Sequence, residues 1–79
     1  MTHPTFQLLD IVGTSTISSD DAIQNGLRKI SGATRRIDWF EVTGTRGQVR
    51  NGEVSQYQVM LRVGIRLEET PARPKDPTP

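Results

Sequence analysis

Few residues of this sequence could carry out catalysis or bind a metal. The chain has no cysteine, and its one histidine, His3, lies close to the N-terminus, so no Ser-His-Asp or Cys-His set can be assembled. Thiolate and imidazole metal sites lack their ligands for the same reason. The acidic pairs Asp20-Asp21 and Glu68-Glu69 fall at an expected helix start and strand end, where the helix dipole and solvation account for them. We therefore predict a protein that is not an enzyme and holds no metal.

Stacking on an aromatic ring is the binding chemistry that the sequence favours, and its candidate is the single tryptophan, Trp39. It lies between Asp38 and Phe40 in a strand-like segment, so it points to the face opposite Phe40. The expected strand pairing places Gly64 across from it, and a large ring beside a residue without a side chain leaves a flat surface. That surface can stack a planar ligand or fill a contact between two copies of the chain, and the pattern leaves both open.

A long β-hairpin is predicted to carry the tryptophan. Residues 37–50 and 53–68 read as two strands, and the Asn-Gly dipeptide at 51–52 strongly favours a two-residue type I′ turn between them. This turn fixes the pairing of the two strands and sets Phe40 opposite Val63. Alternation along both strands gives the same apolar face, so the predicted register is self-consistent.

The same register separates the tryptophan from a second candidate, Gln58. It falls opposite Thr45, six strand positions from Trp39, or about 20 Å at the rise of a strand. One chain does not easily bring both side chains to one ring system at that separation. Either a bulge shortens the path, for which Gly44 and Gly47 are natural places, or two chains share the site.

The upstream elements complete an α+β fold with the order β-α-β-β. Residues 6–13 read as a strand with apolar groups on both faces, which predicts cover on both sides. A helix follows that Ser18 or Ser19 can cap, and its apolar stripe continues to Ala33 over about four turns. Gly26 in this stripe suggests a close approach of the helix to the sheet. We expect one antiparallel sheet whose apolar face packs on this helix.

Size and charge limit the partners. The 79 residues make one domain, and a net charge of +1 gives little steering toward nucleic acid or anionic membranes. Without a signal-peptide pattern or an apolar run of membrane length, we expect a cytoplasmic protein with no membrane or nucleic-acid partner. A chain this short, with no disulfide, usually gains support from assembly, which predicts a homo-oligomer. The prolines in residues 70–79 predict a disordered tail.

These residues together resemble the dodecins, a family of small flavin-binding proteins. The resemblance covers roughly residues 6–68 and predicts a dodecin-like domain over residues 1–69. The matching segments are Leu9 to Ser15, Asp38 to Val42, Arg46-Gly47, Tyr57 to Val59 and Val63 to Glu68.

The resemblance implies three antiparallel strands partly wrapped around one helix, and a hollow homododecamer. It implies flavins bound in pairs at two-fold contacts, each ring lying between its twin and a tryptophan that Trp39 matches. Gln58 matches a glutamine that hydrogen-bonds the isoalloxazine edge. Arg46 and Arg66 match positions that hold phosphate-bearing parts of ligands or ion pairs between protomers, and Asp38 is expected to reach the ribityl hydroxyls. The implied role is flavin storage and buffering, with FMN as the ligand and riboflavin or FAD as alternatives.

Two other functions stay open at this stage. A nucleic-acid-binding module would use Trp39 as a base platform and Arg46, Arg50 and Arg62 for phosphates, although the small net charge counts against it. A purely structural shell protein would use Trp39 to fill an interface.

Overall fold

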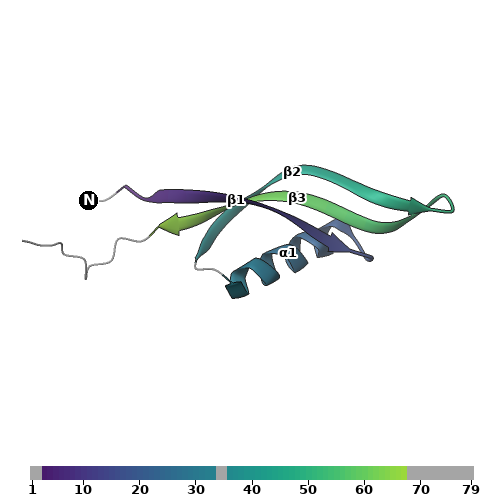
Figure 1. The fold of residues 1–79 in the computed structure, drawn as a ribbon, viewed down its shortest axis with the longest axis horizontal. Helices are drawn as coiled ribbons and strands as arrows, with labels where there is room; N and C mark the ends of the chain where they lie inside the picture. Colours follow the sequence, from purple (N-terminus) through teal and green to yellow (C-terminus); the bar gives the residue numbers. More distant parts are fainter. Residues whose placement is uncertain (1–2, 34–35, 68–79) are drawn as a thin grey trace, which may run out of the picture.

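The chain forms a three-stranded antiparallel sheet with one helix packed against it (Figure 1). The structure is a computed structural model, and it describes residues 3–33 and 36–67. The elements are β1 (Thr5–Ser15), α1 (Ser19–Ala33), β2 (Ile37–Arg50) and β3 (Glu53–Leu67). The sheet order is β1-β3-β2, so the last strand lies in the middle. The predicted β-α-β-β order is confirmed, and the predicted tail over 70–79 lies outside the described residues.

The core forms where alternate residues of β3 face the helix. Val59, Leu61, Val63 and Ile65 are each at most 3% exposed, as the strict alternation of this segment predicted. Ala22 of α1 is fully buried against them. Partly buried apolar side chains complete this core, namely Ile11, Ile23, Leu27 and Tyr57. One face of the central strand therefore supplies most of the buried apolar surface.

The junction between β1 and α1 is held by Ser15, which lies beyond the strand end predicted at residue 13. Its hydroxyl donates to the Asp21 carboxylate at 2.7 Å and accepts the backbone N–H of Ile17 at 2.8 Å. The backbone N–H of Asp21 bonds to the Ser18 hydroxyl at 3.0 Å, which makes Ser18 the N-cap. The strand runs on to Ser15 because β3 continues beside it, with Tyr57 as the partner of Ser15.

Two glycines allow the helix to lie unusually close to β1. A Cβ on Gly13 would sit 2.1 Å from the carbonyl oxygen of Ala22, a distance that no side chain can occupy. A Cβ on Gly26 would lie 3.1 Å from the Gly13 Cα. The close approach predicted from Gly26 is confirmed, and its partner is the glycine at the end of the β1 apolar pattern.

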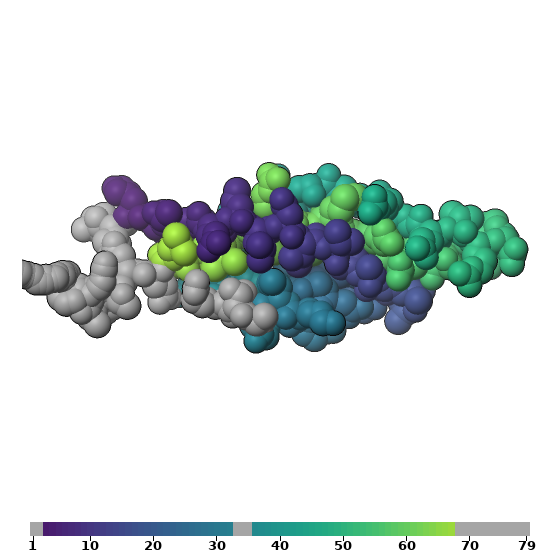
Figure 2. All heavy atoms as spheres, in the orientation of Figure 1, coloured from purple at the N-terminus to yellow at the C-terminus, as the bar shows by residue number. Residues whose placement is uncertain are grey.

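The helix covers only part of the sheet. It packs mainly on β1 and β3, and the apolar residues Phe40 and Val42 of β2 are each 45% exposed. On the opposite face of the sheet Leu8 and Val12 are also exposed, so β1 is not covered on both sides within one chain, contrary to prediction. The end of the β2–β3 hairpin projects beyond both α1 and β1 (Figures 1 and 2). Large apolar surfaces therefore remain that a single chain does not bury.

The glycine contact gives a direct test of the packing. Gly13→Ala should destabilise the protein by about 1–3 kcal/mol, because the new methyl group forces the helix away from the strand. Gly32→Ala is the matched control, since a Cβ there meets nothing within 4 Å and alanine favours the helix by up to about 1 kcal/mol. Urea midpoints at one protein concentration would compare the variants. Equal stability of Gly13→Ala and the wild type would contradict the close contact.

Candidate functional site

The candidate residues lie on the outer face of the sheet, defined here as the face turned away from α1. On β3 this face carries the residues that alternate with the core, which are Gln58, Met60, Arg62, Gly64 and Arg66. Trp39 of β2 pairs with Gly64, as predicted.

Trp39 lies flat across the central strand at Gly64. A Cβ on Gly64 would lie 2.2 Å from the indole Cε2, and 2.4 and 2.6 Å from Cζ2 and Nε1, which are two of the three atoms bonded to Cε2. This Cβ position is nearer Cε2, where the two indole rings are fused, than Cζ2 or Nε1, so it lies over the face of the ring. A position beside the ring edge would be nearer Cζ2 or Nε1 than Cε2. The Phe6 ring meets the indole at 5.9 Å with an interplanar angle of 61°, and Trp39 stays 38% exposed. One ring face is packed on the strand and the other points outward.

The predicted pairing of Gln58 with Thr45 is wrong, and a pair of bulges explains the difference. An extra residue on β3, Ser55, shifts the register after the hairpin end, and an extra residue on β2, Thr43, shifts it back before Trp39. Between these two points Gln58 lies opposite Arg46. The Arg46 Nε–H donates to the Gln58 side-chain oxygen at 2.9 Å.

The bulge at Thr43 also decides which face Arg46 occupies. In a regular strand, Trp39 and Arg46 are an odd number of positions apart and would point to opposite faces. The extra residue changes the alternation, so that both lie on the outer face. Gly44 directly after the bulge was the available sequence signal, and the Thr43 hydroxyl holds the bulge by donating to the Met60 carbonyl oxygen at 3.2 Å.

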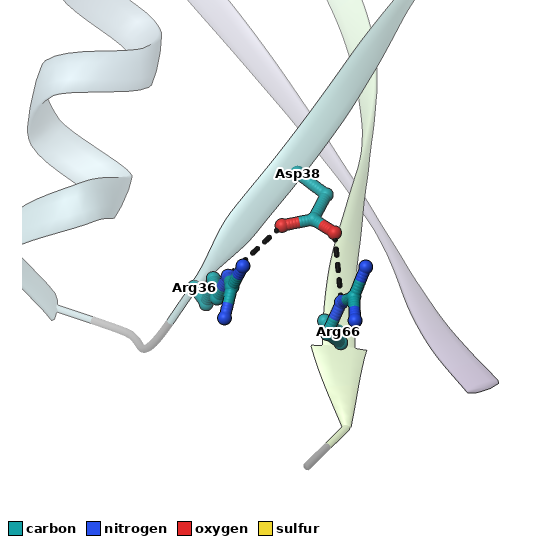
Figure 3. A network of polar contacts seen from close by, with 3 residues as sticks. All are labelled: Arg36, Asp38 and Arg66. Atoms are coloured by element: carbon teal, nitrogen blue, oxygen red, sulfur yellow. Dashed lines mark hydrogen bonds and ion pairs between the residues drawn. The ribbon is translucent and has the colours of Figure 1, made fainter. Parts of the chain in front are cut away.

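A third register shift places Asp38 beside two arginines (Figure 3). Its carboxylate accepts from the Arg66 Nε at 2.9 Å and from the Arg36 Nε at 3.1 Å. The Arg66 hydrogen bond, followed by the charges of both guanidinium groups, holds the pKa of Asp38 below its ordinary value. Arg66 also lies over the Phe6 ring, 5.8 Å from its centroid. Asp38, Arg66 and Phe6 therefore form a connected group beside the Trp39 ring.

The outer-face arginines differ in their partners. Arg62 donates to Asp10 at 3.0 Å, and this hydrogen bond, together with the charges of Asp10 and Glu41, raises the pKa of Arg62. Arg66 is paired with Asp38. Of the three arginines Arg46, Arg62 and Arg66, only Arg46 has no ion pair to a carboxylate of the described residues. Because its bond to Gln58 uses Nε, its terminal nitrogens can still donate to an anionic ligand.

The structure gathers the predicted site residues into two groups rather than one. Asp38, Trp39 and Arg66 form a group near one end of β3, while Arg46 and Gln58 form a second group. Six positions of β3 separate them, or about 20 Å at strand rise. An open hollow of about 410 Å³ lies between the groups and is lined by Asp10, Ile11, Val12, Thr43, Met60, Leu61 and Arg62.

Residues 3–33 and 36–67 contain no cluster of three His, Cys, Asp or Glu side chains that could hold a metal ion. In the same part of the chain, no helix has the length and apolar character needed to cross a membrane.

Comparison with known proteins gives one consistent result. The family described as Dodecin matches residues 5–68. A protein named Dodecin from Thermus thermophilus is 43% identical over 65 residues, covering 82% of this chain and 94% of that protein. The structure of dodecin from Streptomyces coelicolor is 43% identical with a TM-score of 0.82, covering 89% of this chain and 100% of that chain. Dodecin from Streptomyces davaonensis gives the same identity and TM-score over 86% of this chain and 100% of its own.

The Asp38 network predicts a pH-dependent contribution to stability. Because its pKa is lowered on folding, Asp38 stabilises the fold above its ordinary value of 3.8 and loses this contribution as the pH falls through the lower, folded value. The stability difference between the wild type and Asp38→Asn should therefore be largest near neutral pH and vanish in acid. Urea midpoints from neutral to strongly acidic pH, at one protein concentration, would measure it. A difference that does not depend on pH would contradict the ion pairs.

Proposed function

This chain belongs to the dodecin family, and on that premise we propose that it binds a flavin and serves to store and buffer it rather than to catalyse a reaction. The observation that carries the proposal is the outward-facing ring of Trp39, which Gly64 and Phe6 hold flat on the sheet. A fixed, exposed indole face suits a planar ring system such as isoalloxazine. Flavin binding is known for the family, and Trp39 occupies the position that the family resemblance assigns to the stacking tryptophan.

We infer that each flavin takes residues from two chains. Gln58, expected to hydrogen-bond the isoalloxazine edge of the flavin, lies about 20 Å along β3 from Trp39 in the same chain. An isoalloxazine ring cannot span that distance, so the Gln58 that serves a given Trp39 belongs to another protomer. The exposed apolar residues Phe40, Val42 and Leu8 offer surfaces for such contacts. The proposed assembly is the homododecamer implied by the family.

FMN is the proposed ligand, with riboflavin and FAD as alternatives. A phosphate group requires a charged partner that is not already neutralised. Arg62 and Arg66 each pair with an aspartate, whereas Arg46 bonds only the neutral amide of Gln58 among the described residues. Asp38 can still accept a ribityl hydroxyl, because each carboxylate oxygen has a second lone pair.

Storage agrees better with these residues than the other two functions do. Contact with an indole ring quenches an excited flavin, which would limit photochemistry in the bound state. The nucleic-acid alternative relied partly on Arg62, and this side chain is engaged by Asp10. The cytoplasmic location expected from the sequence stays a prediction.

Trp39→Ala should weaken FMN binding by roughly 5- to 150-fold, the range expected from about 1–3 kcal/mol of stacking. Titration of FMN, followed by the loss of its fluorescence, would measure the dissociation constant. The FMN affinity of Trp39→Phe should fall between those of the wild type and Trp39→Ala, because a smaller aromatic ring remains. Unchanged affinity in Trp39→Ala would refute the stacking assignment, and a wild type that assembles but binds no flavin would favour a purely structural shell.

Arg46→Ala tests the choice between FMN and riboflavin. The loss of affinity should be about five- to tenfold greater for FMN than for riboflavin, because only FMN has a phosphate for the guanidinium to bind. Parallel fluorescence titrations with the two flavins at fixed ionic strength would provide the ratio. If both affinities fall by the same factor, Arg46 acts through Gln58 alone and does not hold the phosphate.

A further inference from the structure

A row of polar side chains on the outer face of the hairpin ends in a residue to which no role has been given, Gln56. The Gln58 amide nitrogen donates to the Gln56 side-chain oxygen at 2.8 Å, while Arg46 donates to the Gln58 oxygen at 2.9 Å. We propose that Gln56 is a positioning residue, which fixes the Gln58 amide in the orientation that reads the flavin edge. This inference rests on the proposed function.

The two contacts on Gln58 have different effects. A guanidinium group can only donate hydrogen bonds, so Arg46 determines which end of the amide carries the oxygen. Arg46 is a long, exposed side chain and holds only that end. Gln56 lies two residues before Gln58 and therefore on the same face, where its oxygen holds the amide nitrogen. Together they leave the Gln58 amide little freedom to rotate.

The hydrogen-bond donor and acceptor that Gln58 has left match those on the edge of a flavin. A primary amide has two N–H donors and two acceptor lone pairs on its oxygen. Gln56 takes one donor and Arg46 takes one lone pair, so one of each is left. The pyrimidine edge of isoalloxazine offers an imide N–H beside a carbonyl oxygen, which is the complementary pair. Holding the amide in advance lowers the entropy lost when the flavin binds.

The backbone around Gln56 is itself closely held. A Cβ on Gly47 would lie 2.8 Å from the Gln56 carbonyl oxygen, so glycine lets β2 approach β3 closely at this point. The neighbouring bulge residue, Ser55, donates its hydroxyl to the Gln48 carbonyl oxygen at 3.3 Å. Gln56 therefore projects from a stretch of β3 that is held closely against β2, although the hairpin extends beyond the helix (Figure 1).

Riboflavin is the appropriate probe, because its lack of charge separates this effect from that of a phosphate. Gln56→Leu removes the acceptor and should weaken riboflavin binding by about 3- to 10-fold, as expected for one lost hydrogen bond. Gln56→Glu retains an acceptor at the same place and should stay close to the wild type. Gln48→Leu is the matched control, since Gln48 lies opposite Gln56 and uses only its backbone oxygen in the contact with Ser55.

A double-mutant cycle with Gln58→Ala separates positioning from direct contact. If Gln56 acts through Gln58, Gln56→Leu should have no further effect once Gln58 is alanine, where binding by Trp39 remains measurable. Equal losses in both backgrounds, or no loss in the Gln56→Leu single variant, would overturn the proposal.

Crystal structures without flavin provide a second readout that does not depend on binding. The Gln58 amide should keep its position in the wild type and in Gln56→Glu, and should turn or become disordered in Gln56→Leu. A Gln58 amide that stays in place in Gln56→Leu would overturn the positioning role. If the wild type binds no flavin while the amide moves as expected, the proposed function fails and the contact between the two glutamines stands.

Discussion

A single helix can cover only one face of a three-stranded sheet, and the rest of the structure depends on this constraint. The buried face of β3 supplies the core, and the glycine contact between Gly13 and Gly26 brings the helix close enough to seal it. The outer face, which the helix does not cover, must then be compatible with water or be covered by a ligand or another chain. Its residues meet both requirements. The ion pairs of Arg62 and Arg66 keep the face polar and compatible with water, while Trp39 offers a flat apolar surface for binding.

Local irregularities turn this outer face into a candidate site. Extra residues at Asp38 and Thr43 change the alternation of β2, so that an acidic residue, the tryptophan and an arginine share one face although their spacing is irregular. The same shifts set Arg46 opposite Gln58. The bulges are therefore the structural step that converts a regular hairpin into two binding groups, each completed by another chain in the proposed assembly.

Much of this architecture could be predicted from the sequence, because the strongest signals are local. The Asn-Gly turn adopts the expected positive φ angles of 54° at Asn51 and 80° at Gly52, and the pairing of Trp39 with Gly64 follows from it. The bulges could not be placed by alternation, since the two compensating shifts at Ser55 and Thr43 leave the pairing unchanged both next to the turn and at Trp39. For that reason the predicted partner of Gln58 differs from the observed one by one residue, whereas the predicted partner of Trp39 is correct.

The central claim is that Trp39 and Gln58 of different chains complete one flavin site. It can be tested by co-expressing Trp39→Ala and Gln58→Ala chains in equal amounts and titrating the mixed assembly with FMN. Because each chain retains one of the two residues, about a quarter of the sites should regain wild-type affinity if the residues come from different protomers. If no site in the mixed assembly binds more tightly than those of the separate variants, the shared site is contradicted.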